Sequence, residues 1–236
     1  MCVFIFIFIF MFILIFIFIN IIYNMIIPLG FNCNVSFLNQ ALHIKKETGL
    51  FEWFESRSLQ HITDVINTLT INPESNIIFA EFDRDFEYIY LLNNNLLSCH
   101  YDIDEYKIIF KRRYNRFIDN INKEENIYFI RVNPNGYNTT KNEIELFIES
   151  IKRINPNIKF NFLLIDTIHN ECDFNFITID IDNVIFYHKY FYEKDVNDEY
   201  MQSPTIIYKI YKKILEDIGY NINDTNNIIF DDMSEF

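Results

Sequence analysis

From about residue 100 onward, apolar residues alternate between the spacing of helices and the spacing of strands. Positions three or four apart repeat in three stretches, which predicts helices at 104–121, 139–154 and 204–218. Thr140 and Glu143 have the spacing of a capping box for the second helix, and Gly219 ends the third. Short runs rich in Ile and Phe lie between and after them and predict strands at 126–132, 159–166, 174–181 and 184–188. Strands that alternate with helices are typical of a mainly parallel sheet with helices on both faces. The sequence therefore predicts an α/β fold.

The first half of the chain adds a helix and three strands to this pattern. Apolar residues at 59–69 repeat at helical spacing after Ser58, a residue type that caps helices. Strand patterns follow at 76–82, 88–92 and 96–100. With 236 residues, 50% of them hydrophobic, the chain is long enough for one domain with a substantial core. We expect that single domain at 25–220, followed by an acidic, Asn-rich tail at 221–236.

A single cysteine lies at the turn of the first strand–helix unit. The apolar run 25–27 is followed by Gly30 and Cys33, and then by apolar residues at helical spacing. A thiol at a helix N-terminus lies near the positive end of the helix dipole, which favours the nucleophilic thiolate. Gly30 lies where a sharp turn requires permissive backbone angles. The pattern offers Cys33 as a nucleophile, and the alternative is a small buried apolar side chain.

Two sequence boxes and a helix motif carry a family resemblance. Residues 28–33 read Pro-Leu-Gly-Phe-Asn-Cys, residues 49–54 read Gly-Leu-Phe-Glu-Trp-Phe, and His100 precedes Arg-Arg-Tyr-Asn-Arg-Phe at 112–117. Over about residues 25–170 the chain resembles the family labelled putative papain-like cysteine peptidases, which has Leu-Gly-x-Asn-Cys and Phe-Asp-Trp boxes. The resemblance implies a cysteine peptidase or related hydrolase. It does not imply the papain fold, because the strand–helix alternation favours a parallel sheet over a barrel.

Residues with catalytic chemistry lie at the ends of four of the predicted strands. Cys33 follows the first strand, His100 and Asp166 each close another, and Arg131 and Asn133 lie at the end of a fourth. Ligands of open α/β sheets bind at the carboxyl ends of the strands. If these strands are parallel, all four groups lie along one edge of the sheet. The order Cys, His, then Asn or Asp is, by resemblance, that of papain-like enzymes.

The resemblance implies a role for each of these groups. His100 removes the proton from the Cys33 thiol, and Asp166 or Asn133 orients the imidazole. Backbone N–H groups after Cys33, together with the Asn32 amide, hold the oxyanion. We expect Cys33 and His100 to lie within reach of a hydrogen bond.

An acidic residue among aromatic residues marks the second box. Glu52 is followed by Trp53, the single tryptophan, which serves either as core or as a platform for substrate. A buried carboxylate is costly unless it is paired, so we expect Glu52 to pair with Arg131 or with an arginine of 112–116. Those helix arginines offer either an anion site or a solvated basic face. Glu52, Trp53, Arg131 and Asn133 thus complete a candidate substrate-binding set.

Charge and cysteine content exclude several partners. The formal net charge is −13, which argues against nucleic acid, because phosphate binding requires a basic face. The four cysteines form neither a dense disulfide framework nor a CxxC pair, which favours a reducing compartment. His169, Cys172 and Cys99 suggest a zinc site only weakly, because the second half of a zinc pattern is missing. We therefore expect no metal and no cofactor.

The first 24 residues form a hydrophobic, low-complexity segment dominated by alternating Phe and Ile. Residues 1–19 carry no charge and are long enough to span a bilayer, so one interpretation is an N-terminal membrane anchor. The other is a mis-assigned start, with Met25 as the true first residue. Phe–Ile repetition fits an AT-rich genome such as that of a large DNA virus or a parasite. The protein is membrane-anchored in the first case and cytoplasmic, in a host cell or virion, in the second.

Three classes of function remain open at this point. The first is a cysteine-dependent hydrolase acting on an unknown peptide or small molecule. The second is a non-catalytic binding module with the same fold, and the third is an α/β transferase of sugar or acyl groups. The third lacks a glycine-rich phosphate loop, and its nearest metal motif is Asp-Ile-Asp at 180–182.

Overall fold

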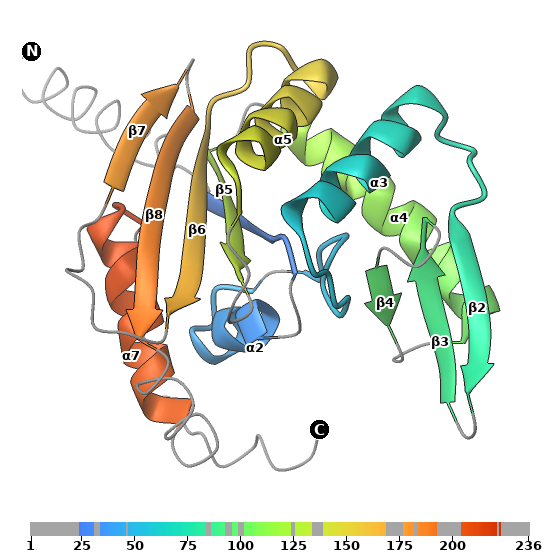
Figure 1. Ribbon diagram of the computed structural model, residues 1–236, viewed down its shortest axis with the longest axis horizontal. Coiled ribbons are helices and arrows are strands. Elements are labelled where there is room, and N and C mark those ends of the chain that lie inside the picture. The colour runs from blue at the N-terminus through green and yellow to red at the C-terminus, as the bar shows by residue number, and fades with distance from the viewer. Residues whose placement is uncertain are drawn as a thin grey trace, which may run out of the picture.

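The sheet at the centre of the computed structural model contains four parallel strands and one antiparallel edge strand (Figure 1). The structure describes residues 24–30, 34–45, 47–83, 86–92, 96–98, 102–123, 126–133, 139–168, 177–181, 184–192, 204–220 and 222. The strand order is β1-β5-β6-β8-β7, where only β7 is antiparallel to its neighbour. The prediction of an α/β fold with a mainly parallel sheet is confirmed.

The elements follow the predicted order closely. The strands of the main sheet are β1 (Asn24–Pro28), β5 (Asn126–Val132), β6 (Phe160–Ile168), β7 (Ile177–Ile181) and β8 (Val184–Tyr192). The helices are α2 (Asn34–Ala41), α3 (Leu59–Ile71), α4 (Ile103–Asn122), α5 (Lys141–Ile154) and α7 (Pro204–Asp217). Strands β2 (Ile78–Asp83), β3 (Phe86–Leu91) and β4 (Leu96–Ser98) form a separate antiparallel sheet.

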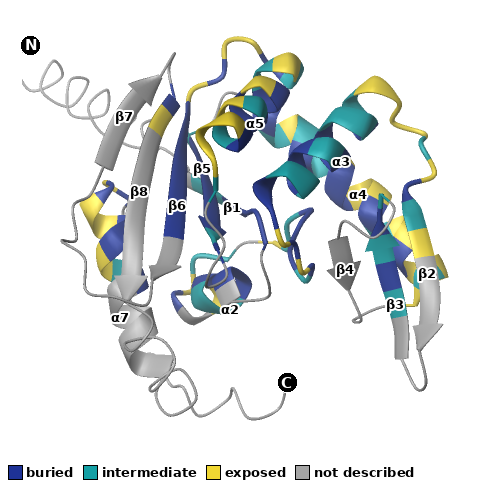
Figure 2. Ribbon diagram, viewed as in Figure 1, coloured by how far each residue is buried: buried dark blue, intermediate teal, exposed yellow. Residues whose placement is uncertain are grey.

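Two hydrophobic cores cover the two faces of the main sheet. Along β5, Ile127 and Phe129 belong to the core shared with α3, α4 and α5. Tyr128 and Ile130 belong to the second core, which α2 and α7 complete. Successive side chains of a strand point to opposite faces, so a strand buried on both faces is mostly apolar. Figure 2 shows this double burial in the dark blue of β5 and β6.

Strand β1 lies at the edge of the sheet and ends at a proline. The N–H of Leu29 donates to the carbonyl of Ile130 at 2.8 Å, so Leu29 faces β5. Alternation then directs Pro28 toward the open side, where its missing N–H costs no ladder bond. Pro28 thus closes the strand directly before the turn that leads to Cys33.

Local signals at the helix ends are confirmed where the structure describes them. The hydroxyl of Ser58 accepts a bond from the N–H of His61 and caps α3. Thr140 and Glu143 form a reciprocal capping box at the start of α5. Gly219 follows α7 with a φ of 79°, which is typical of the residue after a helix.

Within the ranges that the structure describes, no helix combines the length and the apolar character that a bilayer span requires. Residues 1–23, which carry the anchor prediction, and most of the tail at 221–236 lie outside those ranges.

The turn after β1 generates a prediction about Gly30. Its φ is 33°, and an added Cβ would lie 2.7 Å from the carbonyl oxygen of Phe51 and 2.9 Å from that of Phe54. Gly30→Ala should lower the free energy of unfolding by about 3 kcal/mol, because backbone strain and a clash act together. Gly219→Ala is the matched control, since its Cβ would meet nothing within 4 Å. It should cost only about 1 kcal/mol in urea denaturation. Equal losses would contradict the close packing at Gly30.

Candidate functional site

A buried arginine joins the carboxyl ends of β1 and β5 to the loop before α3. Arg131 lies in β5 and is 0% exposed. Its Nη1 donates to the carbonyls of Leu29 and Gly30, at 3.0 and 2.6 Å, and to Ser56 Oγ at 2.8 Å. Its Nη2 donates to the carbonyl of Ser56 at 3.0 Å. One guanidinium therefore connects three segments that are distant in sequence.

The loop 51–56 packs directly on the turn after β1. The Ser56 hydroxyl donates to the carbonyl of Gly30. The same carbonyl oxygen accepts a second hydrogen bond from Arg131 Nη1. The carbonyls of Phe51 and Phe54 occupy the space where a Gly30 side chain would lie. The turn at Leu29 and Gly30 and the loop 51–56 are therefore one packed unit, and Arg131 donates hydrogen bonds to both.

Asn133 extends the arginine network along the same edge of the sheet. Its Oδ1 accepts from Arg131 Nε at 2.6 Å, and its Nδ2 donates to Thr139 Oγ1 at 2.6 Å. Its backbone N–H donates to the carbonyl of Ile165 in β6 at 2.8 Å. Asn133 is 1% exposed, so its amide orients the arginine from within the protein.

Glu52 is buried and paired, but its partner is a lysine and not an arginine. Its Oε2 lies 2.7 Å from Lys45 Nζ and accepts from Ser36 Oγ at 2.6 Å, while Oε1 accepts from the N–H of Gly49 at 2.9 Å. The prediction of an arginine partner is wrong because those arginines make other contacts. Arg131 donates to carbonyls, and Arg116 binds Glu47 and the carbonyl of Thr48.

The Glu52 pair holds the first turn of α2 in place. Ser36 is the third residue of α2 and is 1% exposed. From the other side, the Tyr211 hydroxyl of α7 donates to Asn39 Oδ1 at 2.8 Å. Burial raises the pKa of Tyr211 well above its usual value, and Tyr220 and Glu52 add to the shift. Helix α2 is therefore held at two positions: Ser36 binds the Glu52 carboxylate, and Asn39 binds the Tyr211 hydroxyl.

Trp53 covers the Lys45–Glu52 pair. Its backbone has a φ of 70°, a conformation that a bulky residue rarely adopts. Its ring packs edge-on against Phe37 with centroids 5.3 Å apart, and Lys45 Nζ lies 5.2 Å from the ring centroid. A half-buried ring in contact with a lysine excludes water from the ion pair. The role of Trp53 as a substrate platform stays a prediction.

Comparison with known proteins adds one decisive match. The model of the family described as putative papain-like cysteine peptidase matches residues 24–170, more than half of the chain. The chain belongs to this family. No curated protein and no solved structure matches it. The match covers both boxes, Arg131 and Asn133, so the family region includes every partner described for the Arg131 and Asn133 side chains.

Three of the family residues to which catalysis was assigned lie outside the described residues. These are Asn32, Cys33 and His100; the structure describes the chain up to Gly30 and again from Asn34, where α2 begins. Their roles stay predictions.

One premise behind the shared edge is wrong. The strand that precedes His100 is β4, which belongs to the small antiparallel sheet and not to the sheet that contains β1, β5 and β6. The prediction rested on a parallel register for that strand. Spatial proximity of His100 and Cys33 therefore cannot follow from strand ends alone, and the predicted contact between them stays a prediction.

Asp166 lies within β6 and not at its end, because β6 continues to Ile168. The extension arises from pairing with β8, in which Asp166 is opposite Tyr190. On its other side β6 pairs with β5 only as far as Ile165, opposite Val132. The backbone of Asp166 is therefore level with the end of β5, where Asn133 lies.

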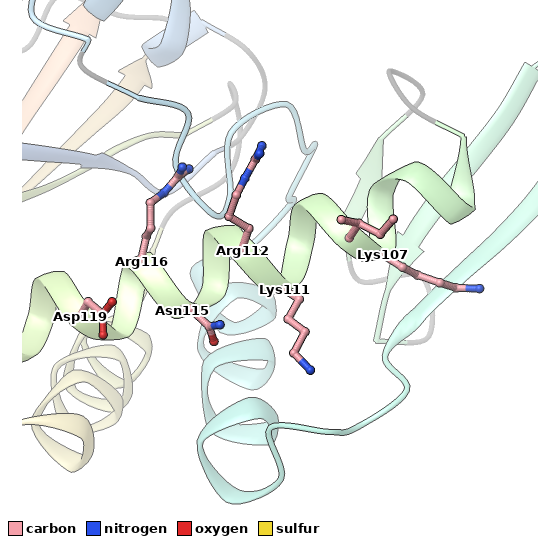
Figure 3. Close-up of a pocket in the computed structure, with 7 residues that line it drawn as sticks. Lys107, Lys111, Arg112, Asn115, Arg116 and Asp119 are labelled. Carbon is pink, nitrogen blue, oxygen red and sulfur yellow. The ribbon is translucent and has the colours of Figure 1, made fainter.

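The three helix arginines do not form a single cluster. Arg113 is 5% exposed and faces the interior, whereas Arg112 is exposed. An open depression of about 580 Å³ runs along the outer face of α4 and is lined by Lys107, Ile108, Lys111, Arg112, Asn115, Arg116 and Asp119. Figure 3 shows Arg112 and Arg116 pointing to one side of α4 and Lys111 to the other. This divergence favours the solvated basic face over a converged anion site.

Metal binding finds no support in the described ranges. They contain no group of three or more His, Cys, Asp or Glu side chains that could hold an ion. Cys99, His169 and Cys172, the weak zinc candidates, lie outside them.

Sequence reasoning missed three residues of the site. Lys45, Ser36 and Ser56 each bind one of the predicted residues through a side chain. The sequence offered one signal for Ser36: it is three positions after Cys33, a spacing that places two helical residues on the same face. Lys45 and Ser56 carried no such pattern, because their contacts depend on how the loop 44–58 folds.

The buried pair generates a prediction about stability. In a double-mutant cycle, Lys45→Met and Glu52→Gln should show a coupling free energy of about 2–4 kcal/mol, because either single variant leaves a buried polar group without its partner. Lys141 and Glu145 on the exposed face of α5 form the matched control, at 3.4 Å. Their coupling should stay below about 0.5 kcal/mol. Similar coupling for both pairs in urea denaturation would show that Glu52 is effectively solvated.

Proposed function

We propose that this chain is a cysteine-dependent hydrolase of the papain-like peptidase type, with Cys33 as nucleophile and His100 as general base. The observation that carries the proposal is the anchoring of the chain on both sides of Cys33. Gly30 is bound by Arg131 and Ser56, and Ser36 of α2 is bound by Glu52. Nucleophiles need such support, because a small misplacement of the attacking atom costs a large factor in rate.

The chemistry follows from the placement of Cys33 directly before α2. The first N–H groups of a helix have no partner within it, so they favour the thiolate and a developing oxyanion nearby. His100 takes the thiol proton, and the sulfur attacks the substrate carbonyl carbon. His100 then returns that proton to the leaving group, and water hydrolyses the thioester. The Asn32 amide supplements the backbone N–H groups around the oxyanion.

The third member of the triad is better assigned to Asp166 than to Asn133. Both ends of the Asn133 amide are engaged, since Oδ1 accepts from Arg131 and Nδ2 donates to Thr139. Asp166 has a backbone position level with the end of β5. A carboxylate also stabilises the imidazolium that forms when His100 accepts the proton.

The alternative is a non-catalytic binding module of the same family. Its support is that the described polar groups at this edge are used inside the protein. Arg131, Asn133 and Glu52 are all at least 97% buried and form hydrogen bonds to neighbouring segments. In that case the network stabilises a shape, and Cys33 is a small apolar residue.

The two functions are separated by the reactivity of Cys33. With a limiting electrophile at neutral pH, the hydrolase predicts that Cys33 is alkylated at least about tenfold faster than Cys99 and Cys172. His100→Ala should slow Cys33 alone, because it removes the base without altering the other thiols. Mass spectrometry of the peptides after brief labelling measures all sites in one sample.

Controls in the same experiment exclude unfolding as the cause. Circular dichroism should show that His100→Ala remains folded, and Cys99→Ser should leave the rate at Cys33 unchanged. If Cys33 reacts no faster than the other cysteines, the hydrolase loses its nucleophile and the binding module is the better assignment.

A further inference from the structure

We propose that Arg131 is the positioning residue of the site: its guanidinium sets the backbone turn that presents Cys33. The inference rests on the proposed function, and it gives Arg131 a role other than binding substrate. Arg131 is fully buried, and its guanidinium donates to the backbone carbonyls of Leu29 and Gly30. It therefore acts on the site through the backbone of this turn.

The planar fork of the Arg131 guanidinium matches the acceptors that surround it. Its described contacts reach three carbonyls, one hydroxyl and one side-chain amide. An arginine holds its N–H donors at fixed angles in one plane, whereas the ammonium group of a lysine is a compact charge on a flexible stem. The fork therefore explains why this position holds an arginine and not a lysine.

The geometry links this fork to the turn itself. The Gly30 carbonyl accepts from both Arg131 Nη1 and Ser56 Oγ, which fixes the plane of its peptide group. Cys33 is only three residues further along the chain than Gly30. On the far side, α2 begins at Asn34 and is held through Ser36. Arg131 thus fixes one of the two ends between which Cys33 lies.

The role of Ser56 follows from the same contacts. Its hydroxyl accepts from Arg131 Nη1 and donates to the Gly30 carbonyl, while its own carbonyl accepts from Arg131 Nη2. Ser56 is 0% exposed and belongs to the loop that covers Gly30. Ser56 therefore joins the loop 51–56 to the turn at Gly30, and Arg131 binds both.

The test measures the alkylation rate of Cys33 in the full-length chain carrying Arg131→Lys, Arg131→Gln or Ser56→Ala. Arg131→Lys keeps the charge but loses the fork, so it should slow Cys33 by about tenfold, as Arg131→Gln does. Ser56→Ala removes one hydroxyl and should slow it by about threefold. The rates at Cys99 and Cys172 in the same samples are internal references.

Asn155→Ala is the control matched for loss of stability. Asn155 is buried at the opposite, amino-terminal edge of the sheet, where its Nδ2 donates to the carbonyl of Ile121 at 2.9 Å. Its loss should lower the melting temperature without changing the rate at Cys33. A merely structural Arg131 would behave like this control. Recovery of the wild-type rate in Arg131→Lys, or rates that follow only the melting temperature, would overturn the proposal.

Hydrogen exchange separates this proposal from the proposed function. Amide exchange in a peptide covering 29–38 should accelerate by at least about tenfold in Arg131→Gln, relative to a peptide of β6, and should not do so in Asn155→Ala. This readout requires no reactive thiol. If Cys33 proves unreactive in the wild type, the hydrolase fails, and accelerated exchange still supports the positioning role. Unchanged exchange overturns it, whatever the reactivity of Cys33.

Discussion

The hydrogen bonds between the Arg131 guanidinium and the backbone carbonyls of Leu29 and Gly30 are the contacts on which the rest of the site depends. They lie where the edge strand β1 ends, and they bring the loop 49–56 onto the turn through Ser56. Gly30 permits this because it has no side chain, and any Cβ would collide with two carbonyl oxygens of that loop. Arg131, Gly30 and Ser56 thus form one hydrogen-bonded unit whose members come from three separate segments of the chain.

The second constraint is that β5 is buried on both faces. Its alternate residues belong to separate cores, one with α3, α4 and α5 and the other with α2 and α7. Polar side chains are therefore concentrated at the two ends of the strand: Asn126 begins it, and Arg131 and Asn133 lie at its carboxyl end. The second core also packs against α2, and Glu52, paired with Lys45, holds the first turn of α2 through its hydrogen bond with Ser36. The site occupies the edge of the sheet where the apolar cores end.

Several errors of the sequence analysis have a common physical origin. The Glu52 partner was assigned by charge type, but the loop after α2 folds back and brings Lys45 within 2.7 Å. The three helix arginines were treated as a group, but a helical repeat of 3.6 residues sends Arg113 to the buried side and Arg112 to the solvent. His100 was placed on the shared edge from its position after a strand, but β4 pairs with β3 in the other sheet. Each error required knowledge of which elements meet in space.

What the sequence determined by itself was local: the repeat of apolar residues, the helix caps at Ser58 and Thr140, and the glycine at the turn before Cys33. These depend on residues within a few positions of one another, so spacing alone predicted them, and the parallel α/β fold followed from their order. The tertiary structure alone decided the partners of Glu52 and Arg131, the separation of β2, β3 and β4 into a second sheet, and the packing of the loop 51–56 on the turn at Gly30. Such contacts join residues up to about one hundred positions apart, as between Arg131 and Gly30. No local pattern encodes them, because they depend on the packing of the whole chain.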